Sequence, residues 1–144
     1  EQRFKANNIQ ELQTRGVEVE YQYFKNSSAQ LPVDFRVAYA YLSQRLSDDA
    51  AAFSRYSIDN DLRHHLVLSA AAEWTKTSSM FTSVKWVERA SGRSYTVVDL
   101  TLSKTFNDLR LHMGLNNLLN QSYWETSLIS MPGRNLFFAL QYRP

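Results

Sequence analysis

Apolar and polar side chains alternate with a period of two along most of the chain. The alternation is unbroken from Val17 to Tyr23, and the segment 109–115 sets leucines and a methionine against an arginine, a histidine and a glycine. A period of two is typical of a β-strand with one apolar and one polar face. The pattern predicts about eight strands, at 3–8, 16–23, 34–44, 62–74, 79–89, 95–104, 109–115 and 135–143.

The connections between these segments alternate between shorter and longer ones. One set consists of the tight turns 75–78 and 105–108 and the modest turn 25–33. The connections that alternate with this set are 9–15, 45–61, 90–94 and 120–134, of which 45–61 and 120–134 are long. We therefore expect an all-β fold, an antiparallel meander of about eight strands. Short turns at one end and long loops at the other are the asymmetry of an outer-membrane β-barrel, so we expect the sheet to be part of one.

Composition narrows the classes of protein that fit. A chain of 144 residues, 44% of them hydrophobic, predicts a single domain over 1–144. The absence of cysteine excludes a disulfide scaffold and thiolate metal sites, and a net charge of +2 with interspersed signs argues against a nucleic-acid partner. The longest apolar run, 66–72, is far below the ~18 residues of a membrane helix. The chain opens with Glu1 and no leader, so we expect a mature chain or an excised piece.

Alternation alone does not distinguish a soluble sheet from a membrane barrel, because both have one apolar and one polar face. Aromatic side chains lie near the ends of the predicted strands, where membrane-interface aromatics belong, namely Tyr21, Tyr23, Tyr41, Trp74, Trp86 and Tyr142. The other face carries charges that need water or partners, namely Glu18, Glu20, Arg36, Glu73, Lys85, Arg110 and Arg143. We expect lipid on the apolar face and a hydrated lumen on the polar face.

A series of short motifs occurs in a fixed order along the chain. The sequence YTVVD at 95–99 is followed by LRLHMGLNNLLN at 109–120, by Tyr123, and by PGR at 132–134 with a last alternating strand. In order and spacing this resembles the C-terminal end of TonB-dependent outer-membrane receptors. Upstream, GVEVE at 16–20 is similar to a "G-V-E-x-E" strand of that family, and DLRHHL at 61–66 resembles a strand start after a long external loop.

The resemblance implies a piece of a barrel of about 22 strands that encloses a plug and imports a scarce ligand. The plug and the segment that contacts the energising TonB complex precede Glu1 in the family, so they are absent here. The motifs are most similar to cobalamin-receptor-like or siderophore-receptor-like members of the Bacteroidetes, which reside in the cell outer membrane. Structural roles are implied for the matching motif residues Gly16, Glu18, Asp99, Asn117, Leu118, Gly133 and Arg134. The family ends on an aromatic residue, whereas this chain ends on Pro144.

Candidate ligand contacts are aromatic and arginine side chains in the predicted external loops, because these capture large, flat or chelated ligands. They are Arg45, Phe53, Arg55, Tyr56, Arg93, Tyr123 and Trp124. The neighbouring Asn116, Asn117 and Asn120 are better interpreted as partners of backbone groups at a strand end. We expect no metal site, because His64 and His65 point to opposite faces, and no cofactor. No nucleophile elbow or glycine-rich phosphate loop occurs, so we expect no enzyme.

Two other interpretations remain open at this point. The chain can be a complete small eight-stranded outer-membrane barrel, which would pair the regions 3–8 and 135–143. It can also be a soluble β-barrel that binds a small apolar ligand and turns Leu111 and Met113 inward. A receptor fragment would leave two open sheet edges, which favour edge-to-edge association with other copies.

Overall fold

The computed structural model describes residues 12–27, 30–46, 62–126 and 129–144. Nine β-strands account for most of these ranges, namely β1 (Leu12–Ser27), β2 (Gln30–Leu46), β3 (Leu62–Thr75), β4 (Ser78–Arg89), β5 (Ser94–Phe106), β6 (Leu109–Asn116), β7 (Trp124–Thr126), β8 (Ile129–Ser130) and β9 (Asn135–Tyr142). Within the same ranges no helix is long and apolar enough to cross a membrane.

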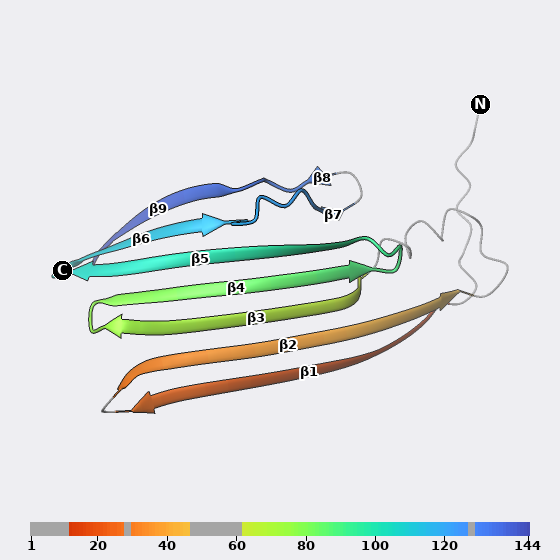
Figure 1. Cartoon of the computed structure of the whole chain (residues 1–144), viewed down its shortest axis with the longest axis horizontal. Coiled ribbons are helices and arrows are strands. Elements are labelled where there is room, and N and C mark those ends of the chain that lie inside the picture. Colours follow the sequence, from red (N-terminus) through yellow and green to blue (C-terminus); the bar gives the residue numbers. More distant parts are fainter. Residues whose placement is uncertain (1–11, 28–29, 47–61, 127–128) are drawn as a thin grey trace.

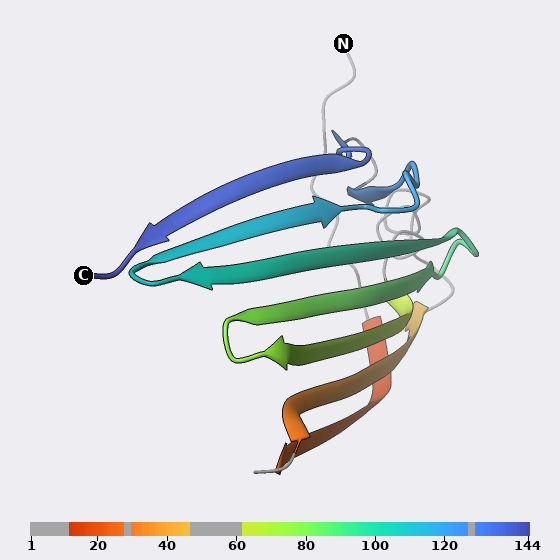
Figure 2. The ribbon, with the colours of Figure 1, turned by 60° about the vertical axis from the view of Figure 1, so that its left-hand side comes forward.

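Seven of the strands form one antiparallel sheet in the order β1-β2-β3-β4-β5-β6-β9, and β7 and β8 pair separately (Figure 1). The prediction of an all-β antiparallel meander is therefore confirmed. The sheet twists and curves along its width without closing on itself (Figure 2). The β3–β4 and β5–β6 turns lie at one end, and the β4–β5 connection and β7–β8 lie at the other (Figure 1).

Seven predicted strands correspond to β1–β6 and β9, and the predicted strand at 3–8 lies outside the described residues. Several predicted connections were too long. Residues Leu12–Arg15 belong to β1 because they pair with Ser43–Leu46 of β2. Leu12–Arg15, Arg45 and Leu46 are therefore strand rather than loop. The predicted loop at 120–134 contains β7 and β8. The strands extend beyond the segments in which apolar and polar side chains alternate, because the backbone hydrogen bonds of a β-ladder require only a neighbouring strand and not an alternating sequence.

Cross-strand register places most of the apolar residues of the seven strands on one side of the sheet. Directly paired residues share a face, and the pairs Tyr21↔Val37, Val37↔Leu68, Leu68↔Val84 and Val84↔Val98 run across five strands. The same side continues through Leu102↔Met113 and Met113↔Phe138 to β9. We call this side the apolar face. It comprises 17–23 in β1, 33–41 in β2, 66–74 in β3, 80–86 in β4, 96–102 in β5, 109–115 in β6 and 136–142 in β9, every second residue in each.

Charged side chains on the apolar side of the ladder stand only near strand ends. They are Arg15, Lys25, Arg45, Glu88 and Lys104, each within four residues of an end of its strand. Aromatic side chains lie toward both ends of the same face. Tyr39, Tyr41 and Trp86 surround His64 at the long-loop end, with ring centroids 5.0–6.2 Å from the imidazole. Trp74, Phe106 and Tyr142 lie toward the short-turn end.

The described part of the chain has almost no conventional core. Its buried hydrophobic residues are Val87, Tyr95, Val97 and Tyr123. These lie on the side opposite the apolar face, which we call the polar face, under the segment that contains β7. By contrast, Val19 is 60% exposed and Leu140 is 68% exposed on the apolar face. Nothing in the described ranges covers that face.

Strand direction at the two edges limits how the sheet can close. Each of the six neighbouring pairs is antiparallel, so β1 and β9, which are separated by six pairings, run in the same direction. Direct pairing of β9 with β1 would therefore be parallel. An antiparallel closure requires an odd number of additional strands between them.

Gly114 of β6 stands on the polar face beneath the ring of Phe137 from β9. A methyl group at this position would overlap the ring, so we expect Gly114→Ala to displace Phe137. Because Phe137 is 40% exposed and its ring can rotate outward, the change lowers the free energy of unfolding in detergent micelles by about 1 kcal/mol, the low end of overpacking costs. In a Phe137→Ala background the same change costs much less; an equal loss in both backgrounds would contradict the arrangement.

Candidate functional site

The long connection after β6 is fastened to the sheet by asparagine side chains. Asn117, only 2% exposed, donates its backbone N–H to Asp99 Oδ1 over 2.8 Å. Its side-chain amide donates to the carbonyls of Gln121 (2.8 Å) and Pro132 (3.2 Å), and its Oδ1 accepts from the Gln121 N–H. Asn117 and Asn120 both have a φ of 52°, a left-handed conformation that asparagine tolerates well. The amides thus satisfy backbone groups where strand pairing stops.

The other motif residues also have local structural roles. Leu118 N–H donates to the Val98 carbonyl over 2.8 Å, and Arg134 N–H donates to Asn120 Oδ1 over 2.9 Å. A Cβ on Gly133 would stand 2.9 Å from that same Oδ1, which explains a glycine there. On β1, a Cβ on Gly16 would stand 2.8 Å from the Tyr41 carbonyl, and Glu18 lies on the polar face opposite Ala40.

Glu125 of β7 attaches this connection to the polar face of β4 and β5. Lys85 Nζ donates to Glu125 Oε1 over 2.5 Å, and the Tyr95 hydroxyl donates to Oε2 over 2.9 Å. Arg89 lies 3.5 Å from Oε2 and also donates to the Glu125 carbonyl over 2.7 Å. One carboxylate therefore joins two strands and a loop.

Aromatic packing supports the same contact. The rings of Tyr95 and Tyr123 have centroids 4.7 Å apart, and Lys85 Nζ lies 5.7 and 5.5 Å from them. Leu62 and Met131 pack against this cluster. Because the ammonium group faces two rings and a carboxylate, the loop is held by both charge and apolar contact.

The charges around Glu125 determine its protonation. Partial burial acts to raise the pKa of Glu125, but hydrogen bonds from Lys85 and Tyr95 and the nearby positive charge outweigh it. The pKa of this carboxyl group is therefore held below its ordinary value. Glu125 is an anion at neutral pH.

A hollow of about 240 Å³ lies beside this contact at the long-loop end. Its walls come from the ends of β4 and β5, from the β4–β5 turn and from the segment leading into β7, namely Arg89, Arg93, Ser94, Tyr95, Ser122, Tyr123 and Trp124. Arg93 and Trp124 are exposed, and Trp124 keeps 49% of its surface in solvent. A guanidinium beside an indole suits an anionic or flat ligand.

The structure gathers three of the predicted ligand contacts in this hollow, namely Arg93, Tyr123 and Trp124. Tyr123 is 9% exposed, so most of its ring packs against the protein. Arg45 lies apart at the end of β2, two strands from β4. Phe53, Arg55 and Tyr56 lie outside the described residues.

Sequence reasoning missed the cluster of Arg89, Tyr95 and Glu125, and it placed Lys85 on the polar face without identifying which residue is its partner. The alternation identifies the face of residues in β4 and β5 but says nothing about which loop residue meets them. Lys85 and Glu125 are 40 positions apart. In the described ranges no group of three or more His, Asp or Glu side chains is arranged to hold a metal ion.

Comparison with known proteins adds no relative. No family model, curated protein or solved structure matches the chain.

Acidification should release the β7 segment. The pKa of Glu125 in the folded chain is lower than the value of about 4.3 for an unfolded glutamate. The stability that the ionised carboxylate of Glu125 contributes is therefore fully present above about pH 4.3. It is lost as the pH falls through the folded pKa. The Met131 N–H, which donates to the Tyr123 carbonyl, reports the change in hydrogen exchange.

We expect Glu125→Gln to reduce protection of the Met131 amide at pH 7 and to remove its acid dependence. Glu73→Gln, a change to an exposed acid on the same face, should alter neither. Unchanged Met131 protection in Glu125→Gln would show that the carboxylate does not hold the segment.

Proposed function

We propose that the chain is an arc of a TonB-dependent receptor barrel in the cell outer membrane, with its apolar face toward lipid and its polar face toward the lumen. The observation that carries this proposal is the apolar face itself. It extends over seven strands, places its charges only at strand ends, and has no cover in the described ranges. Lipid supplies such a cover, and terminal Lys and Arg side chains reach the headgroups.

Strand length supports the same assignment. The strands β1 to β5 contain 12–17 residues. Strands of globular proteins usually contain about 3–10 residues, and a tilted membrane-spanning strand needs about 9–11. Five consecutive strands of this length fit a barrel whose wall crosses a bilayer and extends beyond it.

The polar face has the character expected of a hydrated lumen. Arg36 donates to Glu20 over 2.8 Å, and both side chains are about half exposed, 53% and 52%. This exposed pair stands in mid-strand, where lipid would be costly for it. The apolar face has no such pair in the described ranges.

The parity of the strands fits a larger closed sheet. Bacterial barrels made from one chain have an even number of strands, and this sheet needs an odd number more to close antiparallel. The remaining strands of a receptor satisfy this requirement. A complete eight-stranded barrel, the second candidate, would need only one additional strand for antiparallel closure.

The position of the buried cluster disfavours the soluble alternative. A soluble barrel with an internal apolar ligand turns Leu111 and Met113 inward and gathers its core on their side of the sheet. The buried cluster around Tyr95 lies on the polar face instead.

In this proposal the β7 segment narrows the external mouth of the lumen. The hollow beside Arg93 and Trp124 then offers first contacts to an imported ligand with acidic or flat groups, such as cobalamin or a ferric siderophore. Energy for import comes from the TonB complex through other parts of the receptor. The chain itself supplies wall and loop, with no catalytic residue and no cofactor.

The absence of cysteine allows a direct test, because one introduced thiol is unique. Leu100 and Thr101 are neighbours in β5 on opposite faces. We expect a fluorophore on Leu100→Cys, in chain refolded into phospholipid vesicles, to be quenched several-fold more by spin-labelled lipid than one on Thr101→Cys. Aqueous iodide should show the reverse order.

The pair Leu102→Cys and Ser103→Cys is an independent repeat one step along the strand. Equal quenching of both members of each pair by iodide would contradict a lipid-facing apolar side. A chain that stays monomeric in buffer without vesicles would contradict it as well.

A further inference from the structure

Two arginines are neighbours on the apolar side of the sheet at its long-loop end. Arg15 of β1 is paired with Ser43 of β2, and Arg45 lies two residues further along β2. Residues in this diagonal relation lie about 7–8 Å apart, so two long side chains can reach a common group. Both arginines are exposed.

Neither arginine has an ion-pair partner in the described ranges. The acidic residue on the apolar side at this end, Glu88, belongs to β4 and lies two strands from β2, at least about 10 Å away. Two guanidinium groups as close as Arg15 and Arg45 repel each other, and an anion between them removes the repulsion.

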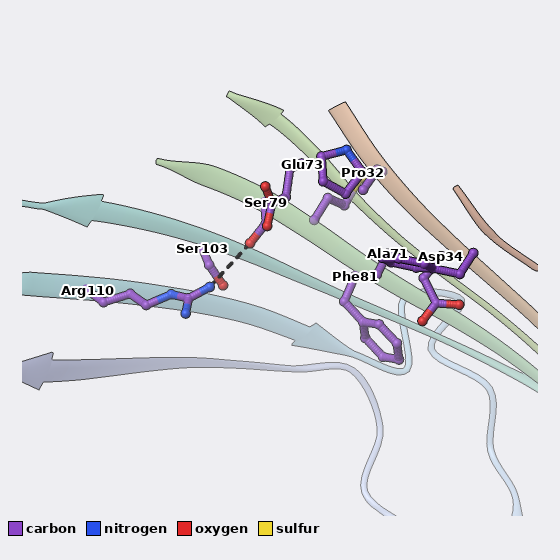
Figure 3. Close-up of a pocket in the computed structure, with 11 residues that line it drawn as sticks. Pro32, Asp34, Ala71, Glu73, Ser79, Phe81, Ser103 and Arg110 are labelled. Carbon is purple, nitrogen blue, oxygen red and sulfur yellow. Dashed lines mark hydrogen bonds between the residues drawn. The ribbon is translucent and has the colours of Figure 1, made fainter. Parts of the chain in front are cut away.

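Two arginines of the polar face show the contrast, because each has a partner. Arg36 donates to Glu20 over 2.8 Å. Arg110 lines a second hollow, of about 330 Å³, at the short-turn end and reaches across β5 to Ser79 of β4, where the Nη2–Oγ distance is 3.5 Å (Figure 3).

In the proposed function, Arg15 lies at the border of the band that faces lipid. Lys25 is on the same side of β1, ten positions further along the strand. Ten residues with a rise of about 3.3 Å each, at a tilt of about 40°, cross about 25 Å of bilayer, which is the height of the apolar band of membrane barrels. Arg15 and Lys25 therefore reach opposite headgroup layers.

The two borders have different chemistry on β1 and β2. Lys25 is a single ammonium group that is paired with Val33. At the other border Arg15 and Arg45 present two planar guanidinium groups, which match phosphate oxygens in pairs. A phosphate monoester has about −1.5 to −2 charges at pH 7 and three acceptor oxygens, so it suits two guanidinium groups better than a singly charged diester does.

The surface beside the pair suits the remainder of a lipid. Val17, the next residue toward mid-sheet on the same side of β1, is 60% exposed and is paired with Tyr41. The Tyr41 ring in turn packs on His64, whose Nδ1 lies 2.8 Å from the Tyr39 hydroxyl. Aromatic rings of this kind are typical of the layer between headgroups and acyl chains.

We propose that Arg15 and Arg45 together bind the terminal phosphate of an anionic membrane lipid in the leaflet at the long-loop end. The phosphate lies between the two guanidinium groups, and the acyl chains run over Val17 and Tyr41. This inference rests on the proposed function, because it takes lipid as the cover of the apolar face. It adds a preference for one headgroup at one place, which a lipid-facing surface does not require.

Fluorescence quenching in phosphatidylcholine vesicles measures this preference at single positions. A fluorophore on Val17→Cys is quenched by a small fraction of spin-labelled phosphatidic acid, which has a terminal phosphate, or of spin-labelled phosphatidylglycerol, an anionic diester, or phosphatidylcholine. We expect phosphatidic acid to be enriched about fivefold over phosphatidylcholine beside Val17→Cys, and phosphatidylglycerol by much less. A fluorophore on Tyr23→Cys, near Lys25, should report an enrichment below about twofold.

Variants of the chain assign the contact. Arg15→Gln and Arg45→Gln should each lower the enrichment at Val17→Cys, and the double variant should bring it to the value found at Tyr23→Cys. Lys25→Gln removes a cation from the same strand and the same side, so it is the matched control and should change nothing at Val17→Cys. Excess inorganic phosphate should not reduce the enrichment, because the free anion makes no acyl-chain contact.

The outcomes separate this inference from the proposed function. Equal quenching of Val17→Cys by phosphatidic acid and phosphatidylcholine overturns the inference alone, whereas quenching by neither lipid overturns both. Loss of the enrichment in inorganic phosphate, or an equal effect of Lys25→Gln and Arg15→Gln, overturns the assignment to a lipid phosphate at this pair. The comparison of the three lipids on the chain with both arginines decides the question even if an arginine variant does not insert.

Discussion

The exposure of one apolar face that runs across seven strands is the constraint on which the rest of the structure depends. Transfer of a large aliphatic or aromatic side chain out of water stabilises by about 1.5–3 kcal/mol. Side chains as large as Tyr21, Phe138 and Leu140 are each more than half exposed on this face. With so few buried hydrophobic residues in the described ranges, the sheet derives its stability from what covers it. The register that aligns these residues across seven strands therefore creates a face that needs a cover, which in the proposed function is lipid.

The polar face follows from the same register and concentrates the chemistry. Every second residue of each strand points to it, so ionisable groups from several strands become neighbours there. At the long-loop end, Glu125 joins Lys85, Arg89 and Tyr95 and holds the β7 segment against the sheet. At the short-turn end, Arg110 and Asp34 both line a hollow of about 330 Å³. The polar face is therefore covered by the chain at its long-loop end and hollowed at its short-turn end.

The sequence predicts the strands well because a period of two requires only neighbouring residues. Seven strands follow from it, and so do the face assignments of Leu109 to Leu115 and of Val17 to Tyr23. Strand ends were wrong at Leu12–Arg15 and at Arg45, because pairing with the next strand, and not alternation, determines where a ladder stops. The Glu125 contact and the reach of Arg110 across β5 were not predictable. Both join residues 31 or more positions apart through side-chain conformations that periodicity does not encode.

Strand orientation in a bilayer tests the central claim most directly. Polarised infrared spectroscopy of the chain in aligned phospholipid bilayers measures the mean angle between the strands and the membrane normal. The account predicts strands tilted about 35–45° from the normal, as in membrane barrels. Strands lying in the plane of the membrane, or protein that remains in the aqueous phase, would contradict a sheet that spans the bilayer with its apolar face toward lipid.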